Sequence, residues 1–211
     1  VLSSRGLAAA IYTQTSDVEI ECNGLMTYDR RVIKHPDAEL AKLAAAVYKG
    51  TAEPERAVRT VLPTAKASPQ DWAYTFAKPV KGWEQPGFDD SAWKRGPGGF
   101  GNPGIAEAYP TEVRVRTAWN TPAAWFRRTF ESDGKLPDGA FWNVFHDEDC
   151  KVCLNGVLVA TLDGFTASYE QVEMDMAAVR KALKPGRNVL AVSVVNAGGG
   201  AYFDIGIDYY E

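Results

Sequence analysis

The sequence predicts a mainly β protein, in which an antiparallel β-sandwich over residues 70–211 follows a single strand and helix. Three observations predict the sandwich. Short runs of β-forming residues follow one another closely from residue 70 onward, separated by Gly, Pro, Asn and Asp. Between two of these runs, Asn155-Gly156 is the typical sequence of a tight hairpin turn. Helical periodicity is scarce in this part, which favours an antiparallel sandwich.

The first residues read as a βα piece that is incomplete by itself. The hydrophobic run 8–14 predicts a strand, and a polar loop ending in an Asn23-Gly24 turn follows it. Acidic and amide side chains populate this loop: Asp17, Glu19, Glu21 and Asn23. A lone strand and helix cannot bury their apolar faces, so we expect them to belong to a larger sheet.

The helix after this loop begins at His35-Pro36-Asp37. Proline suits the first helical turn, and the acidic Asp37 and Glu39 complement its positive end. One apolar stripe follows the helical repeat and predicts a packed face, with the strand 8–14 as its expected partner. The stripe consists of Leu40, Leu43, Ala44 and Val47. Lys49-Gly50 closes the helix.

The composition divides the chain into three parts. Residues 1–50 hold the strand, loop and helix. Residues 51–69 are polar, interrupted by proline and typical of a linker, with 57–62 as a short strand on the way. Residues 70–211 form the sandwich, which contains one short helix at 176–183. The stretch 96–104 is too rich in glycine for regular structure, and no lysine follows it as in a phosphate-binding loop.

We expect nine strands in the sandwich. They are 73–76, 113–117, 125–130, 140–146, 151–154, 157–161, 168–174, 188–196 and 202–210.

Composition excludes several classes of function. The 211 residues carry a net charge of −4, which gives no basic surface for nucleic acid. No apolar run approaches the roughly 20 residues that span a bilayer, and the first residues lack the pattern of a signal peptide. Six Trp, nine Tyr and nine Phe suit either a sandwich core or stacking on sugar rings.

The cysteines predict no metal or redox site. Cys150 and Cys153 have the CxxC spacing, but strand alternation places Cys150, Val152 and Leu154 on one face and Cys153 on the other. The two sulfurs therefore cannot converge on one metal ion. Only two histidines are present to complete a zinc site, so metal catalysis is not expected.

Several motifs together resemble those of glycoside hydrolase family 2-like enzymes. The string YTQTSDVEIECNGLMTYDR (12–30) is similar to the last βα unit of their catalytic (β/α)₈ barrel. The second half resembles the galactose-binding-like jelly-roll modules of the same enzymes. Its matching strings are PGFDDSAWKRGPGGFG (86–101), AWFRRTFE (124–131), HDEDCKVCLNGV (146–157), LKPGRNVLAV (183–192) and GGGAYFDIGI (198–207).

The resemblance implies hydrolysis of a β-linked glycoside, with retention, by a larger parent protein. Retaining glycosidases use two carboxyl groups about 5–5.5 Å apart. In the family these come from barrel strands 4 and 7, which this chain lacks, so we assign no catalytic residue and expect the chain alone to be inactive. No GxSxG or HExxH motif offers another active site.

The resemblance also implies that the loop after barrel strand 8 faces bound sugar, because functional groups gather at that end of the strands. Gln14, Asp17 and Asn23 are then candidate substrate-binding residues, the two amides being suited to sugar hydroxyls. For Glu19 and Glu21 two interpretations stay open. They are solvated loop carboxylates, alone or paired with an arginine at 30 or 31, or they help to shape the sugar subsite.

Within the sandwich, Trp83 and Trp119 lie in loop-like sequence and are the candidates for stacking on sugar. Trp125 and Trp142 fall within strand patterns and are expected in the core. Because Arg127-Arg128 alternates faces, one of the two arginines must point inward or along an edge and needs a carboxylate partner.

Two acidic segments have open interpretations. The residues 89–91 (Asp-Asp-Ser) favour a turn, with a structural Ca²⁺ site as the alternative. The residues 147–149 (Asp-Glu-Asp) form an exposed acidic loop or the rim of a carbohydrate or interdomain contact.

The sequence therefore predicts the C-terminal part of a glycoside hydrolase, with carbohydrate and the rest of the barrel as partners. No cofactor, nucleic acid or membrane is expected. Periplasmic or secreted localisation follows by analogy with such enzymes. The sandwich is an accessory module that binds sugar or braces the barrel. The alternatives are a stand-alone carbohydrate-binding module without catalytic activity and a purely structural module.

Overall fold

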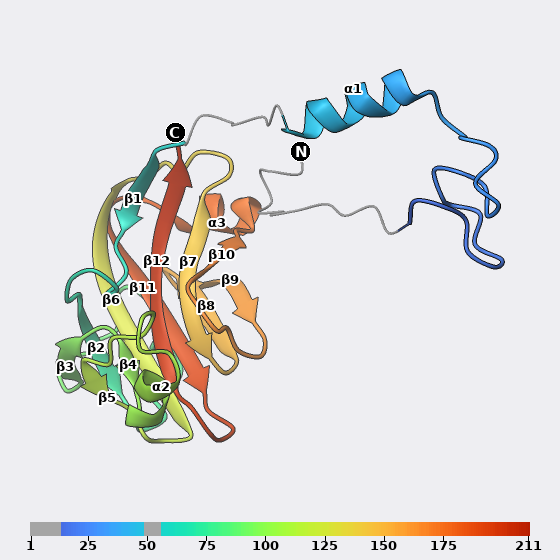
Figure 1. The fold of residues 1–211 in the computed structure, drawn as a ribbon. Coiled ribbons are helices and arrows are strands. Elements are labelled where there is room, and N and C mark those ends of the chain that lie inside the picture. Colours follow the sequence, from blue (N-terminus) through green and yellow to red (C-terminus); the bar gives the residue numbers. More distant parts are fainter. Residues whose placement is uncertain (1–13, 49–55) are drawn as a thin grey trace. The chain divides into compact units, whose positions relative to one another are not determined.

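The computed structural model describes residues 14–48 and 56–211, and the chain divides into two compact units, 1–56 and 57–211. The first unit consists, in its described part, of a loop followed by helix α1 (Asp37–Tyr48). The second unit is mainly β, with two six-stranded sheets in a sandwich-like arrangement (Figure 1). The expected strand 8–14 lies outside the described residues except for Gln14.

The first sheet has the strand order β10-β7-β12-β4-β5, and its sixth strand, β1, also pairs with β12. These strands are β10 (Glu170–Glu173), β7 (Phe141–Asp147), β12 (Tyr202–Tyr210), β4 (Phe100–Gly101), β5 (Thr117–Ala118) and β1 (Val58–Leu62). The pairs are antiparallel except for β4 with β5.

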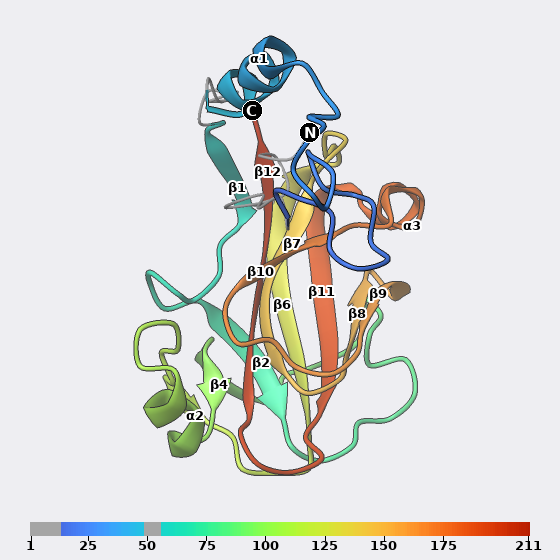
Figure 2. The ribbon, with the colours of Figure 1, turned by 45° about the vertical axis from the view of Figure 1, so that its right-hand side comes forward.

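The second sheet has the order β3-β2-β6-β11-β8-β9 and is antiparallel throughout. Its strands are β3 (Lys94–Pro97), β2 (Asp71–Thr75), β6 (Ala123–Asp133), β11 (Pro185–Val195), β8 (Cys150–Leu154) and β9 (Val157–Leu162). Two short helices lie at opposite ends of the sandwich, α2 (Pro103–Ala108) and α3 (Met176–Ala182) (Figures 1 and 2). The predicted sandwich is thus present, whereas its jelly-roll character stays a prediction.

Large aromatic side chains fill the space between the sheets. Phe126 of β6 stacks on Phe203 of β12, with ring centroids 4.9 Å apart, so the contact joins the two sheets. Trp72 of β2 meets both rings edge-on. Such pairs favour edge-to-face or offset geometry and add to the stability gained from burial. Trp142 is completely buried, as expected, whereas Trp125 is only half-buried.

The local predictions around the hairpin are confirmed. Strands β8 and β9 pair across Asn155-Gly156, where both residues have positive φ angles of 50° and 84°. That geometry is what an Asn-Gly hairpin turn requires. Cys150, Val152 and Leu154 are buried on one face of β8, and Cys153 lies on the other.

Part of the range that was expected to be a linker belongs to the sandwich. The short strand expected near 57–62 is β1, which pairs with β12 at the far end of the sequence. Leu62 and Ala65 are completely buried. Residues 51–55 of this range lie outside the described residues.

The prediction for 96–104 is wrong, because this glycine-rich stretch contributes to β3, all of β4 and the start of α2. Its glycines allow backbones to approach closely. A Cβ on Gly99 would lie 2.2 Å from the carbonyl oxygen of Arg114, and one on Gly101 would lie 2.6 Å from that of Ala201. The expected strand 113–117 is reduced to the two-residue β5, which pairs with β4.

Helix α1 begins and ends close to the predicted positions, but its apolar stripe is not covered by the described residues. Leu43 is 59% exposed, Ala44 is exposed and Leu40 is only half-buried. The expected packing of this face against the strand 8–14 falls outside the described part of the chain. The described residues of the first unit therefore form no hydrophobic core of their own.

Candidate functional site

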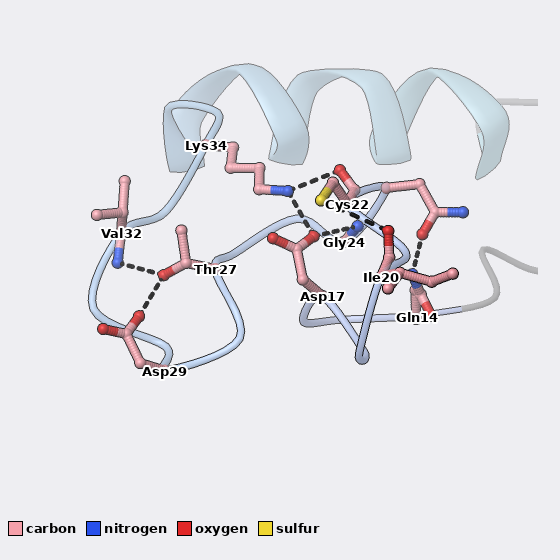
Figure 3. Close-up of polar contacts among 10 residues, drawn as sticks. Gln14, Asp17, Ile20, Cys22, Gly24, Thr27, Asp29, Val32 and Lys34 are labelled. Atoms are coloured by element: carbon pink, nitrogen blue, oxygen red, sulfur yellow. Dashed lines mark hydrogen bonds and ion pairs between the residues drawn. The ribbon is translucent and has the colours of Figure 1, made fainter.

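The loop of the first unit is organised around Asp17. Its Oδ1 accepts hydrogen bonds from the backbone N–H of Gly24, at 2.9 Å, and from the Lys34 ammonium (Figure 3). Lys34 also donates to the carbonyl oxygen of Cys22 at 2.8 Å. The Lys34 hydrogen bond is the main cause that lowers the pKa of Asp17. Asp17 is therefore ionised at neutral pH. Its carboxylate joins the start of the loop to Gly24 and to Lys34 at the end of the loop.

Gly24 is the residue that allows this arrangement. A Cβ at this position would lie 2.3 Å from the backbone nitrogen of Asp17, a distance that no side chain tolerates. The polar loop can close on itself only because Gly24 has no side chain. The tight turn predicted at Asn23-Gly24 is a bend in the structure, without a positive φ at either residue, and Gly24 is required there for close packing.

A second set of hydrogen bonds fixes the segment before α1. The Asp29 carboxylate accepts from the Thr27 hydroxyl at 2.6 Å, and the Thr27 oxygen accepts from the backbone N–H of Val32 at 3.1 Å (Figure 3). The Thr27 hydroxyl is the main cause that lowers the pKa of Asp29. Arg31 pairs with Asp29 at 3.6 Å, and so it is not the partner of Glu19 or Glu21.

The structure brings together the three candidate residues that were expected on this loop. Gln14 Nε2 donates to Asn23 Oδ1, and Asp17 lies in the same loop, hydrogen-bonded to Gly24 beside Asn23 (Figure 3). Glu19 and Glu21 are exposed. Whether any of these side chains contacts sugar stays a prediction.

The two tryptophans predicted to stack on sugar have different surroundings. Trp83 is half-buried and stacks on Trp93, with ring centroids 6.0 Å apart. Trp119 is completely buried, meets Phe126 edge-on, and donates from Nε1 to the Thr121 hydroxyl at 3.0 Å. A ring without exposed surface offers no face to a sugar, so the expectation for Trp119 is corrected: it is a core residue.

Arg127 holds the loop that carries Trp83 on the sandwich. This arginine is 2% exposed, and its Nε donates to Asp90 Oδ2 at 2.9 Å. Its Nη1 donates to the carbonyl oxygens of Trp83 and Gln85. The carboxylate partner expected for one of the two arginines is thus Asp90. Asp89 accepts from the backbone N–H of Ser91 at 2.9 Å, which is the geometry of the predicted turn.

An open pocket of about 670 Å³ was not predicted from the sequence as a site. It lies at the end of the sandwich that carries α2, and the loops after β7, β9 and β11 contribute to its lining. The acidic segment 147–149 supplies Asp147 and Glu148, and the exposed Phe165 is the residue that the sequence reasoning missed. The only available signal was an aromatic residue inside a polar loop, which does not distinguish it from packed aromatics.

No metal centre is found in the described part of the chain, and the two cysteines with the CxxC spacing, Cys150 and Cys153, are not reactive thiols. No group of three or more His, Cys, Asp and Glu residues there could hold a metal ion. Burial raises the pKa of Cys150 to about 12 and that of Cys153 to about 11, so both stay protonated. None of the helices in residues 14–48 and 56–211 combines the length and apolar character needed to span a bilayer.

Comparisons with known proteins give structural neighbours but no family. The chain matches no protein-family model and no curated protein sequence. Among solved structures it is similar to a Bacteroides uniformis β-glucuronidase bound covalently to cyclophellitol-6-carboxylate aziridine, with a TM-score of 0.47 and 19% identity over 74% of this chain and 18% of that one.

Two further neighbours have similar values. A glycosyl hydrolase family 2 member from Bacteroides cellulosilyticus has a TM-score of 0.43 and 17% identity over 70% of this chain and 20% of that one. A β-glycosidase from Bacteroides vulgatus has a TM-score of 0.44 and 17% identity over 69% and 20%. The chain thus spans about a fifth of the length of these proteins. TM-scores below 0.5 do not establish a shared activity.

Proposed function

We propose that the chain is the C-terminal part of a glycoside hydrolase, similar to those of family 2, that acts on β-linked carbohydrate. In this proposal, residues 1–50 are the last strand, loop and helix of a (β/α)₈ catalytic barrel. The sandwich is a galactose-binding-like jelly-roll module that binds sugar or braces the barrel. The sequence motifs at 12–30 and in the sandwich support this assignment to a parent enzyme.

The observation that carries the proposal is the exposed apolar surface of the first unit. Ile20 is 94% exposed and Tyr28 is 70% exposed, and Val32, Ile33 and Leu43 are each more than half exposed. Isolated exposed apolar residues are common, but the large side chains in the described part of this unit, residues 14–48, are mostly exposed and form no core among themselves. The neighbouring elements of a barrel would cover these side chains.

The ordered polar contacts of the same unit support the assignment further. Asp17, Gly24 and Lys34 are joined by hydrogen bonds although the apolar side chains around them are exposed. A loop with fixed polar contacts but little apolar support is what the active-site end of a barrel strand presents once its neighbours are removed. Gln14 and Asn23 are then placed at the edge of the sugar subsite.

The chemistry of the reaction would come from the parent. Hydrolysis with retention needs one carboxyl group as acid and base and a second as nucleophile. Enzymes similar to those of family 2 supply both carboxyl groups from barrel strands 4 and 7. Glu19 and Glu21 stay unassigned, with a supporting role in the subsite as the alternative to solvated carboxylates. No cofactor is proposed.

An activity assay tests the proposal. The polypeptide encoded by the complete reading frame, purified to homogeneity, should hydrolyse aryl β-glycosides, and the matched 211-residue chain should not. Hydrolysis by the 211-residue chain alone would contradict the proposal that this chain lacks the two catalytic carboxyl groups. A reading frame that begins at Val1, with no other chain to supply the barrel, would overturn the assignment to an enzyme.

A stand-alone carbohydrate-binding module is the second candidate, because an open pocket with acidic and aromatic lining lies at one end of the sandwich. It predicts sugar binding by the 211-residue chain without any hydrolysis by the complete polypeptide. Trp83 on the side of the sandwich stays a candidate contact in both cases. Export to the periplasm or the medium is proposed by analogy only.

A further inference from the structure

The pocket beside α2 is built from segments that are far apart in the sequence. Asp147 is the last residue of β7 and Glu148 follows it, Phe165 follows β9, and Gly199 and Gly200 follow β11. Helix α2 closes another side of it. Figure 1 shows α2 and the loop between β11 and β12 at the same end of the sandwich. With a volume of about 670 Å³, the pocket has the size of a small-molecule site.

Two carboxylates of this pocket have unused acceptor capacity. Asp147 and Glu148 are both half-buried, and no described residue donates a hydrogen bond or forms an ion pair to either carboxylate. Asp149, next in the chain, differs because its Oδ1 accepts from the backbone N–H of Gly164 at 2.6 Å. Burial and the nearby Glu148 raise the pKa of Asp147. A ligand that supplies hydrogen-bond donors would relieve this cost.

The surroundings hold the backbone that carries the two carboxylates and leave room for Asp147. The Glu148 carbonyl oxygen lies 2.8 Å from Nδ1 of the buried His146, which anchors the turn. A Cβ on Gly200 would lie 2.5 Å from Asp147 Oδ2, so the absence of a side chain there leaves room for the carboxylate. Asn102, which also lines the pocket, caps α2 through its Oδ1 and donates from Nδ2 to the Gly199 carbonyl at 3.0 Å.

An aromatic ring lies next to these acceptors. Phe165 is 68% exposed, and its backbone forms an antiparallel bridge with Asp147. The side chain therefore lines the pocket without serving the core. A flat apolar ring beside two carboxylates matches a sugar, whose C–H face packs on an aromatic side chain while its hydroxyl groups donate to carboxylates.

We propose that this pocket binds the terminal ring of a glycan through Phe165, Asp147 and Glu148, and that it prefers an uncharged sugar. The choice of carbohydrate as the ligand class rests on the proposed function. The preference for an uncharged ring rests on charge, because the residues that line this pocket, all within the described sandwich, include two acids and neither Lys nor Arg. A uronic acid would bring its own carboxylate close to Asp147 and Glu148, and no lysine or arginine lines the pocket to pair with it.

Titration of the 211-residue chain with three probes tests the proposal. Methyl β-glucopyranoside and methyl β-galactopyranoside represent uncharged rings, and methyl β-glucuronide represents a charged one. Calorimetry gives the affinities, and amide NMR locates the site. We expect at least one uncharged probe to bind, with shifts at Gly199, Gly200 and the turn at 147–148, and the glucuronide to bind at least about tenfold more weakly.

Matched variants show whether the binding uses this pocket. Phe165→Ala and Glu148→Gln should each weaken binding roughly tenfold, since each removes one of the proposed contacts. Leu158→Ala and Glu173→Gln are the controls, because both are exposed residues of the same sandwich outside the pocket. Thermal unfolding should be unchanged in all four, which separates lost binding from lost structure.

Three results would overturn the proposal. They are the absence of binding by either uncharged probe, affinities that Phe165→Ala and Glu148→Gln leave unchanged, and tighter binding of the glucuronide. None of them affects the hydrolase assignment, which depends on turnover by the complete polypeptide. Conversely, if the complete polypeptide hydrolyses no glycoside, sugar binding measured at this pocket would still stand.

Discussion

Replacing Arg127 by methionine is expected to destabilise the sandwich by about 3–4 kcal/mol. The variant keeps a similar apolar volume but leaves Asp90 and the carbonyl oxygens of Trp83 and Gln85 without the donor that now joins them. Asp90 retains Arg95 as a partner at 2.7 Å, which limits the loss. The segment that carries Trp83 should detach from the sheet, because Arg127 provides three of its anchoring hydrogen bonds.

Urea unfolding, followed by tryptophan fluorescence, measures this loss. The matched control is Arg187→Met, which removes an exposed arginine from the neighbouring strand β11 and should change the free energy of unfolding by less than about 0.5 kcal/mol. In Arg127→Met we also expect red-shifted native-state emission as Trp83 and Trp93 become solvated. A loss below about 1 kcal/mol with unchanged emission would show that the loop is held by other contacts.

The second large effect is a pH dependence that arises from Asp204. This residue of β12 is completely buried, and its Oδ2 accepts from the Ala65 backbone N–H at 2.7 Å and from the Tyr169 hydroxyl at 2.6 Å. Its Oδ1 has no partner in the described residues. Burial raises the pKa of Asp204 to about 6, although both hydrogen bonds and the charge of Arg128 oppose this shift.

A raised pKa means that the folded protein holds a proton that the unfolded chain releases. Between pH 4 and pH 6 this group therefore lowers the free energy of unfolding as the pH rises. Its stabilising contribution is complete below about pH 4 and lost above about pH 6, and the pKa shift corresponds to about 3 kcal/mol. The nearby Tyr169 and Tyr202 stay neutral in this window, since burial raises the pKa of both.

Comparison with Asp204→Asn isolates this contribution from other acids. The stability of the native protein relative to this variant should fall by about 2–3 kcal/mol between pH 4 and pH 7, as measured by urea unfolding at each pH. Asp163→Asn, the same change at an exposed position of the same sandwich, is measured alongside as the control. A difference that is flat or increases with pH for Asp204→Asn would mean that Asp204 is ionised in the folded state throughout.

The sequence predicted the parts of the fold that depend on neighbouring residues. The turn at Asn155-Gly156 follows from the conformations those two residues accept, and the faces of β8 follow from simple alternation. Helix α3 ends before Lys184-Pro185-Gly186, as expected. Composition was misleading where tertiary packing prevails, as in β4, whose glycine permits the close approach of the Ala201 carbonyl.

Contacts between distant segments could not be predicted in this way. β1 pairs with a strand about 150 residues later, and nothing within 57–62 specifies that partner. Trp119 lies in a segment with little regular structure, and only the assembled core decides that it is buried. The pocket beside α2 combines residues from five separate strand connections, so Phe165 has no local signal of its position.

In the proposed enzyme, residues 14–48 belong to a barrel whose other elements cover their apolar side chains, and this placement can be tested. Amide hydrogen exchange of these residues tests it most directly, when measured in the complete encoded polypeptide and in the 211-residue chain. We expect protection of α1 and of the loop around Asp17 to be at least about 100-fold stronger in the complete polypeptide. Equally weak protection in both proteins would contradict it.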